Sequence, residues 1–215
     1  MPRYHPDLHA AADHALRQLD DDWARLVDRC GPRGAPQHPG QDPYQTLIRA
    51  VIHQQVHGRA AAAILGRLLA LFPQQPFPAP EQLLATTPEQ LRACGLSASK
   101  QRSVLGIADA KRAGRIPDYD SAQQMDDDSL IRQLTELWGV GRWTVEMLLI
   151  DTLGRTDILP VDDFGVREGY RRLKQLPQSP TPKQLRELGA AWAPYRTFAS
   201  WYLWHAGHNL PAPAP

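Results

Sequence analysis

The chain has 215 residues and a formal net charge of +1, and its 42% hydrophobic and 22% charged residues are the usage of a globular domain. No apolar run reaches the ~18 residues of a membrane span, and residues 1–10 lack the pattern of a secretory signal, so we expect a soluble cytoplasmic protein. Two cysteines, Cys30 and Cys94, exclude a disulfide framework and a four-thiolate zinc or iron–sulfur site.

The charges are spread unevenly along the chain. Residues 31–115 carry ten Lys and Arg against four Asp and Glu, an excess of +6, whereas residues 1–30 and 116–215 carry −2 and −3. A basic middle segment is compatible with a phosphate-binding face. A solvated helical surface explains the same charges equally well.

The predicted elements are helices throughout. Asp42 followed by Pro43 is a helix start, and the apolar residues after it recur at helical spacing: Tyr44, Leu47, Ile48, Val51 and Ile52. Residues 87–90 and 181–184 both read as capping boxes with proline at the first position, and Gly95 ends the first of these helices. A further apolar stripe predicts a helix that ends at Trp138: Leu130, Ile131, Leu134, Leu137 and Trp138. Because no sustained period-2 alternation predicts a strand, we expect an all-α fold.

A short turn follows that stripe. Gly139-Val140-Gly141 joins it to a second predicted helix that begins at Arg142. Glycine at both ends allows positive φ, and outward amides with a helix N-terminus form an anion site. This is the helix-hairpin-helix pattern, which binds a DNA backbone phosphate without contacting the bases or recognising their sequence. A tight turn between packed helices explains the same residues.

Five stretches of the sequence, in this order, carry a family resemblance. They are VIHQQVHGRAA at 51–61, GLSASKQRSV at 95–104, LWGVGRWT at 137–144, DILPVDDFGVREG at 157–169 and APYRTFASWYLWH at 193–205. Together they resemble the helix-hairpin-helix DNA glycosylases, specifically the AlkA-type branch of 3-methyladenine DNA glycosylase II. The resemblance implies double-stranded DNA with damaged bases as the partner, and a protein that acts as a monomer, associated with the nucleoid in a bacterium.

The resemblance also implies two helical subdomains with a cleft between them. Residues 43–155 are expected to form one subdomain, with the wedge loop and the helix-hairpin-helix. Residues 1–42 together with 156–215 are expected to form the other, which carries the catalytic aspartate.

Two acidic residues compete for the catalytic role. Cleavage of an N-glycosidic bond builds positive charge on the sugar, which an ionised carboxylate at a helix N-terminus stabilises. Asp162 and Asp163 both precede a predicted helix, and the family order of Asp, any residue, Gly, hydrophobic matches Asp163-Phe164-Gly165-Val166. We therefore expect Asp163 to be catalytic, with Asp162 as a helix cap or supporting residue. Plain capping explains both residues as well.

The residues after the hairpin indicate the reaction and the substrate. Strand-nicking relatives carry a nucleophilic lysine where this chain has Trp143, so the resemblance implies a monofunctional enzyme that uses water. It also implies that Trp143 and Trp204 are aromatic walls of the base pocket, which suit cationic alkylated bases. Met147 replaces an aromatic of the family pocket, which leaves the lesion range open. The remaining tryptophans are assigned to packing (Trp23, Trp138, Trp192) or left undecided (Trp201).

The resemblance places contacts to DNA at other positions too. Gln55, with Gln54 beside it, is expected to be the wedge that fills the gap left by a flipped base. Backbone phosphate is expected at Gly139, Val140, Gly141 and Arg142, with Lys100 and Arg102. A monovalent cation, Na⁺ or K⁺, is expected on the hairpin carbonyls of Thr135, Leu137 and Val140, and no other cofactor is expected.

Several alternatives stay open at this stage. His53 and His57 are four residues apart, so they are candidate zinc ligands on one helix face, although HQQVH lacks the glutamate of the metalloprotease motif. A non-catalytic helix-hairpin-helix protein that binds DNA is the second functional hypothesis. A glycosylase for deaminated or oxidised bases is the third.

Overall fold

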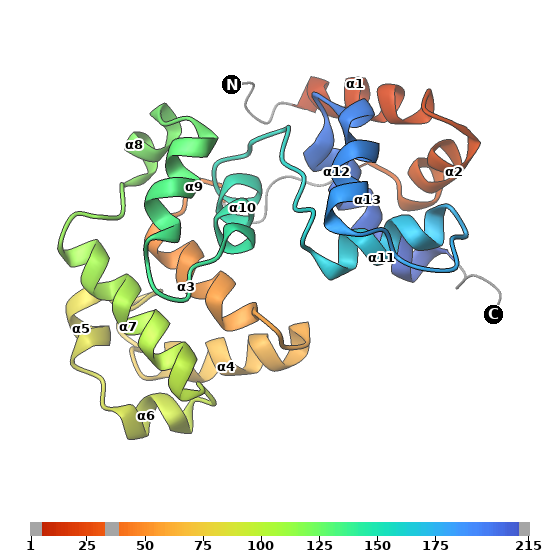
Figure 1. The fold of residues 1–215 in the computed structure, drawn as a ribbon. Helices are drawn as coiled ribbons and strands as arrows, with labels where there is room; N and C mark the ends of the chain where they lie inside the picture. The colour runs from red at the N-terminus through yellow and green to blue at the C-terminus, as the bar shows by residue number, and fades with distance from the viewer. Residues whose placement is uncertain (1–5, 33–38, 211–215) are drawn as a thin grey trace. The chain divides into compact units, whose positions relative to one another are not determined.

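The computed structural model describes residues 6–32 and 39–210, and every regular element in these ranges is a helix (Figure 1). The predicted all-α fold is confirmed. None of the described helices is long and apolar enough to cross a membrane. The chain divides into two compact units, one that contains residues 38–153 and one that contains the segments before and after it.

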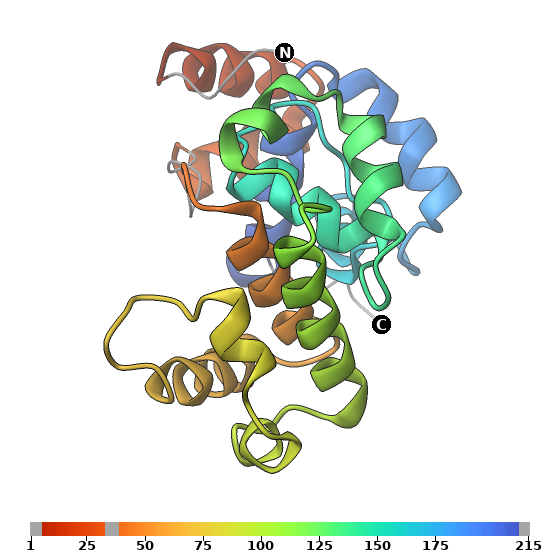
Figure 2. The ribbon, with the colours of Figure 1, turned by 90° about the vertical axis from the view of Figure 1, so that its left-hand side faces the viewer.

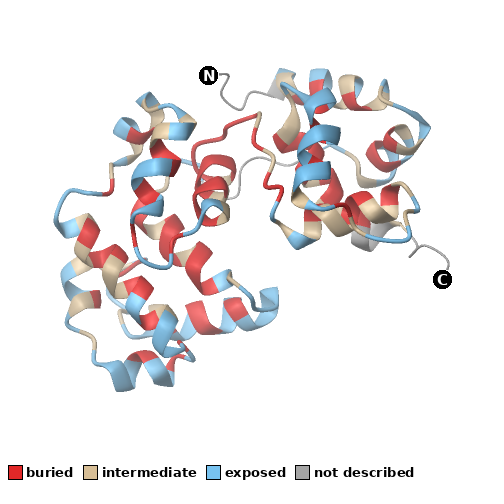
Figure 3. Ribbon diagram, viewed as in Figure 1, coloured by how far each residue is buried: buried red, intermediate tan, exposed pale blue. Residues whose placement is uncertain are grey.

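The unit of residues 38–153 is built around α3 (Figure 2), whose apolar face is buried (Figure 3). Leu47, Ile48, Val51 and Ile52 are all 0% exposed, as their helical spacing predicts. Helix α3 packs against α4, α7 and α10. The helices of this unit are α3 (Pro43–His53), α4 (Gly58–Ala70), α5 (Pro80–Leu84), α6 (Pro88–Ala93), α7 (Ala98–Arg112), α8 (Tyr119–Gln124), α9 (Asp127–Thr135) and α10 (Arg142–Asp151).

The predicted helix starts are confirmed. The Asp42 carboxylate accepts a hydrogen bond from the Tyr44 N–H at 2.8 Å at the start of α3. Thr87 and Thr181 each form a capping box with the glutamine three residues later, and Gly95 ends α6 with φ +95°. These signals are local in sequence, so they do not depend on how the helices later pack.

The other unit is built around the pair α11 and α13, with α2 against both. Trp23 and Trp192 meet edge to face in its core with ring centroids 5.2 Å apart, so their assignment to packing is confirmed. The helices of this unit are α1 (Pro6–Arg17), α2 (Asp21–Cys30), α11 (Phe164–Leu173), α12 (Pro182–Leu188), the 3₁₀ turn η1 (Gly189–Trp192) and α13 (Arg196–Asn209).

The boundaries between the units lie at residues 37/38 and 153/154, a few residues from those expected at 42/43 and 155/156. Two contacts explain the difference. Asp42, before α3, pairs with Lys111 of α7 at 2.8 Å, which ties it to the first unit. The Arg155 carbonyl accepts a hydrogen bond from the Thr197 hydroxyl at 2.8 Å, which ties residue 155 to α13 in the second unit.

Candidate functional site

The hairpin between α9 and α10 differs from its prediction at both ends. Helix α9 ends at Thr135, three residues before the predicted end at Trp138. Only the first glycine has positive φ, +77° at Gly139, and a Cβ there would overlap the Ser103 hydroxyl of α7. Gly141 has φ −88° and is the extended N-cap residue of α10. The turn therefore requires glycine at 139 for conformation and for close approach.

The sequence predicts that the backbone amides of the turn point outward, but at least one of them does not. The Val140 N–H donates to the Leu137 carbonyl at 3.0 Å, and Val140 is 4% exposed. Helix α10, by contrast, begins without a side-chain cap, and a Cβ at Gly141 would face open space. The candidate phosphate site is therefore the N-terminus of α10, where the helix dipole also favours an anion.

Helix α10 carries a buried carboxylate that the sequence analysis missed. Glu146 is 2% exposed, and its Oε1 lies 2.9 Å from the Nε of Arg142. This ion pair orients an arginine whose side chain is half exposed at the start of the helix. The four-residue spacing of Arg142 and Glu146 was a signal for this pair.

Trp143 and Met147, the expected base-contacting residues of α10, are each half-buried. They lie four residues apart, so they occupy one face of the helix. Thr144 and Val145 between them are buried on another face. The two residues therefore share a partly exposed face of α10.

Asp163 is the N-cap residue of α11. Its Oδ1 accepts two hydrogen bonds of 2.9 Å, one from the Val166 N–H and one from the indole Nε1–H of Trp204. Asp162 is exposed and does not cap the helix, so its expected role as a cap is wrong. The structure therefore gives the two aspartates different environments and brings only Asp163 together with a predicted aromatic.

Two glycines on α11 allow Trp204 to reach this carboxylate. A Cβ at Gly169 would overlap the backbone carbonyl of Leu203 on α13. One turn earlier, a Cβ at Gly165 would lie 3.0 Å from Trp204 Cδ1 and 3.1 Å from Asp163 Oδ1. Both distances are shorter than ordinary contacts, so the close helix pair depends on glycine at both positions.

The segment before Asp163 is fixed to the start of α13. Asp157 accepts a bidentate pair from Arg196, with Nε–Oδ1 at 2.6 Å and Nη2–Oδ2 at 2.8 Å. The Thr197 hydroxyl accepts from the Ile158 N–H at 2.9 Å. These contacts link residues 39 positions apart, and they fix residues 157 and 158, just before the part of the loop that carries the aspartates.

The turn after α3 places its two glutamines differently. Gln55 is exposed with φ +55°. The side-chain amide of Gln54 instead donates to the Gly139 carbonyl at 3.1 Å and to the Thr144 hydroxyl at 2.8 Å. Of the two wedge candidates, Gln55 is the one that is exposed, whereas Gln54 is half-buried.

Lys100 does not have the geometry expected of a phosphate ligand. Its ammonium donates to the carbonyls of Ile52 at 2.6 Å and Gln54 at 2.9 Å, and its partial removal from water lowers the pKa of Lys100. We therefore correct the assignment of Lys100: instead of binding phosphate, it caps the carbonyls at the C-terminal end of α3.

Trp138 was assigned to packing, and this is wrong. Its side chain is 46% exposed, and the Arg102 guanidinium lies 4.1 Å from the centre of its ring. The helix ends before Trp138, so the side chain leaves the apolar stripe of α9. The stacked pair holds the planar guanidinium of Arg102 at the surface beside the hairpin.

Comparison with known proteins identifies the family. The model of the HhH-GPD superfamily of base excision DNA repair proteins matches residues 48–194, more than half of the chain. The chain belongs to this superfamily. The resemblance carried by the five sequence stretches is confirmed.

Individual members of the HhH-GPD superfamily match over most of their length. The DNA-3-methyladenine glycosylase 1 of Schizosaccharomyces pombe is 43% identical over 194 residues, which is 90% of this chain and 85% of that protein. The solved structure of that enzyme, Mag1, with abasic DNA has a TM-score of 0.88 and covers 91% of this chain and 95% of its own. The structure of a DNA-3-methyladenine glycosidase from Bacillus halodurans is 30% identical with a TM-score of 0.75. The match covers 96% of this chain and 93% of that one.

Two metal sites were considered for this HhH-GPD protein: a zinc site at His53 and His57, left as an open alternative, and the expected monovalent cation at the hairpin. His53 ends α3 and His57 is the N-cap of α4, so the two histidines do not share a helix face and the zinc hypothesis fails. The described residues contain no cluster of three His, Cys, Asp or Glu side chains suited to a metal. The hairpin carbonyls fit a monovalent cation only in part, because the Leu137 carbonyl already accepts the Val140 N–H with one of its two lone pairs.

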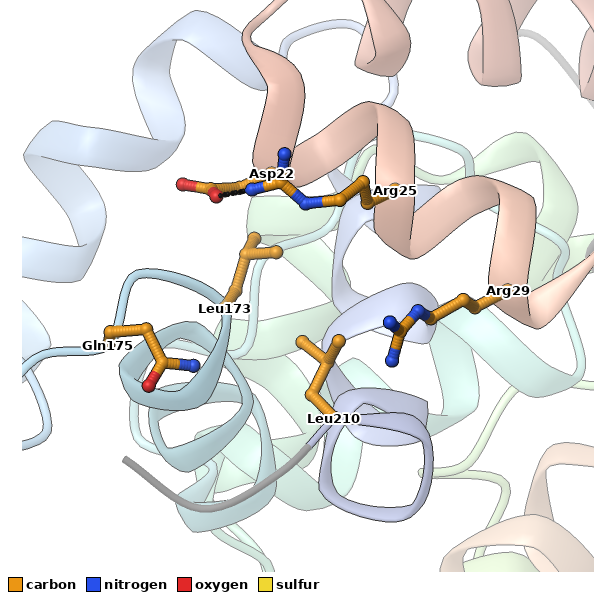
Figure 4. Close-up of a pocket in the computed structure, with 6 residues that line it drawn as sticks. All are labelled: Asp22, Arg25, Arg29, Leu173, Gln175 and Leu210. Carbon is orange, nitrogen blue, oxygen red and sulfur yellow. Dashed lines mark hydrogen bonds and ion pairs between the residues drawn. The ribbon is translucent and has the colours of Figure 1, made fainter. Parts of the chain in front are cut away.

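A cavity of about 190 Å³ in this HhH-GPD protein lies away from the catalytic candidate (Figure 4). It is lined by Asp22, Arg25, Arg29, Leu173, Gln175 and Leu210, and Arg25 pairs with Asp22 at 2.5 Å. It lies at the C-terminal end of α11, whereas Asp163 caps the N-terminus of that helix, about 15 Å away along ten residues. It is also smaller than the roughly 300 Å³ of ordinary small-molecule sites.

Proposed function

We propose that this protein is a monofunctional DNA glycosylase that removes alkylated bases of the 3-methyladenine and 7-methylguanine type from duplex DNA. It hydrolyses the N-glycosidic bond and leaves an abasic site, which is the first step of base excision repair. The observation that carries the proposal is the carboxylate of Asp163, held at the N-terminus of α11 by the Val166 amide and the Trp204 indole. The Schizosaccharomyces pombe relative named for this activity supports the substrate class.

Asp163 supplies electrostatic stabilisation in the proposed mechanism. As the bond to the base lengthens, positive charge develops on the deoxyribose. A fixed carboxylate stabilises that charge and accepts a proton from the attacking water. Two donors on Oδ1 fix the orientation of the group before the reaction begins, so little reorganisation is needed in the transition state.

The absence of a lysine at position 143 makes the enzyme monofunctional. A lyase forms a Schiff base through a lysine amine, and this chain has the indole of Trp143 at that position. The base therefore leaves with water as the nucleophile, and the DNA strand stays intact.

The partly exposed face of α10 that carries Trp143 and Met147 supports recognition of a cationic base. Trp143 presents an electron-rich ring, and such a ring attracts a positively charged base by about 0.5–2 kcal/mol. Met147 on the same face adds a polarisable side chain of adaptable shape. We assign both residues to contact with the extruded base. Trp204 takes part through its hydrogen bond to Asp163.

The hairpin and the turn after α3 hold the DNA backbone in this proposal. The N-terminus of α10 receives one phosphate, with Arg142 and Arg102 beside it as cationic contacts. A monovalent cation on the carbonyls of Thr135, Leu137 and Val140 would add positive charge for that phosphate. Gln55 enters the stack where the base has left. The enzyme would act as a monomer, in the cytoplasm where the DNA of a bacterium lies.

The test uses duplexes that contain one 7-methylguanine or 3-methyladenine, with an undamaged duplex as the control. We expect release of the free base and an alkali-labile abasic site in an otherwise intact strand. Borohydride should trap no protein–DNA adduct, because no Schiff base forms. Adduct formation would contradict the monofunctional mechanism. Binding without release of either base would leave a non-catalytic DNA-binding protein, and release of only deaminated or oxidised bases would change the substrate class.

A further inference from the structure

The turn after α3 has a backbone conformation that needs support. Gln55 has φ +55°, a region that residues other than glycine, asparagine and aspartate rarely occupy. Such a conformation is unfavourable for a residue with a side chain and persists where the surroundings hold it. The Gln55 side chain is exposed, so the support comes from its neighbours.

The first support is a lysine from another helix. Lys100, in the first turn of α7, donates from Nζ to the carbonyls of Ile52 and Gln54. These carbonyls lie on both sides of His53, at the end of α3 where the helix leaves its last acceptors without intrahelical donors. A cation at this position also interacts favourably with the negative end of the helix dipole.

The second support joins the turn to the hairpin. The Gln54 amide nitrogen donates both to the carbonyl of Gly139, in the hairpin, and to the hydroxyl of Thr144, in the first turn of α10. Thr144 is 0% exposed, so this contact is shielded from water on one side. Ser103, one turn after Lys100 on α7, packs against Gly139 where a Cβ would not fit. The turn, the hairpin and α7 are therefore fixed to one another.

We propose that Gln54 and Lys100 are positioning residues that set the register between the wedge and the phosphate site. The proposal rests on the proposed function, in which Gln55 fills the gap in the stack and the start of α10 binds a phosphate. With Gln54 bonded to both the hairpin and α10, a phosphate bound at the start of α10 fixes where Gln55 enters the duplex. Gln54 acts through Gln55 and does not touch the DNA.

A double-mutant cycle tests this coupling. The variants are Gln54→Leu, Gln55→Ala and the two combined, with Lys100→Met and Lys100→Arg. Lys111→Met is the matched control, because Lys111 lies on the same helix and pairs with Asp42 instead. The readouts are single-turnover release of 7-methylguanine, and the fluorescence rise of 2-aminopurine placed beside an abasic-site analogue in a duplex. Both are measured well below the melting temperature of each variant.

We expect Gln54→Leu and Gln55→Ala each to lower the release rate and the fluorescence rise by about tenfold. The combined variant should lose no more of the release rate or the fluorescence rise than Gln55→Ala alone, because Gln54 is proposed to act only through the wedge residue Gln55. Lys100→Met should behave like Gln54→Leu, Lys100→Arg should recover part of the loss, and Lys111→Met should match the wild type.

Losses that multiply in the combined variant would overturn the proposal, as would a full fluorescence rise in Gln54→Leu. If Gln55→Ala were fully active, Gln55 would not be the wedge and the proposal would fail with it. If the wild type released no alkylated base, the proposed function would fail, and the 2-aminopurine signal alone would still decide whether Gln54 acts through Gln55.

Discussion

The indole N–H of Trp204 donates a hydrogen bond of 2.9 Å to Oδ1 of Asp163, a residue 41 positions earlier in the chain. The contact exists because Gly165 and Gly169 let α11 and α13 approach closely. An aromatic residue expected only as a wall for the base thus also orients Asp163, the candidate catalytic carboxylate.

Replacing Trp204 with phenylalanine should separate these two roles. The ring remains but the N–H donor is lost, so Asp163 keeps only the Val166 amide on Oδ1. We expect the single-turnover rate of base release to fall by about tenfold, with duplex affinity within about twofold of the wild type. An unchanged rate in Trp204→Phe would show that the hydrogen bond does not contribute to catalysis.

Gly169→Ala should destabilise the protein. The added methyl group meets the Leu203 carbonyl, a backbone atom that cannot turn aside, and we expect a loss of about 2 kcal/mol. Thermal unfolding should then begin several degrees lower. Gly106→Ala is the matched control, because it lies within α7 with open space around a Cβ and should stabilise by about 0.5–1 kcal/mol. Equal melting temperatures for the two variants would rule out a steric need for glycine at 169.

Stability should fall in acid through Glu168. Hydrogen bonds from Arg171, with weaker ones from Arg172 and Ser179, lower the pKa of Glu168 to about 2 from its ordinary value of 4.5. A lowered folded-state pKa adds stability that is fully present above pH 4.5 and is lost as the pH falls toward 2. Glu168→Gln should therefore melt below the wild type at pH 7, and the gap should close by pH 2. A gap that stays constant between pH 7 and pH 2 would contradict this assignment.

Arg142→Gln should weaken binding to every duplex alike. If Arg142, half exposed at the start of α10, contacts a phosphate as we propose, the slope of log affinity against log salt should fall by about 1 without a change in base preference. Arg186→Gln, on the exposed face of α12, should leave the slope unchanged. A selective loss for one lesion would instead place Arg142 against the base.

The features that could be predicted from the sequence are those set by residues close together in the chain. The caps at Asp42, Thr87 and Thr181 follow from residues two or three positions apart, and Asp163 follows from a motif of four. The errors concern contacts between distant residues. Lys100 meets carbonyls 46 and 48 positions away, and Gln54 meets Gly139 across 85.

The solvent exposure of a side chain was equally hard to predict where it depends on a contact with another residue. Trp138 continues an apolar stripe in the sequence, but the helix ends before it and Arg102 covers one face of its ring. Nothing in the sequence indicated that Glu146 would be buried, and it lies beside Arg142 with 2% of its surface exposed. The type of a residue does not determine which charged or aromatic side chain will pack against it in the folded unit, and so does not determine its exposure.

The most direct test of the account compares Asp163→Asn with Asp162→Asn on a duplex with one 7-methylguanine. Asn at 163 keeps a side-chain oxygen that can accept from Val166 and Trp204 but removes the negative charge, so duplex affinity should persist. Base release by Asp163→Asn should fall by a factor on the order of 10²–10³, while Asp162→Asn, whose side chain is exposed, should stay near the wild type. Full activity in Asp163→Asn, or loss of activity in Asp162→Asn alone, would contradict the assignment of the catalytic carboxylate.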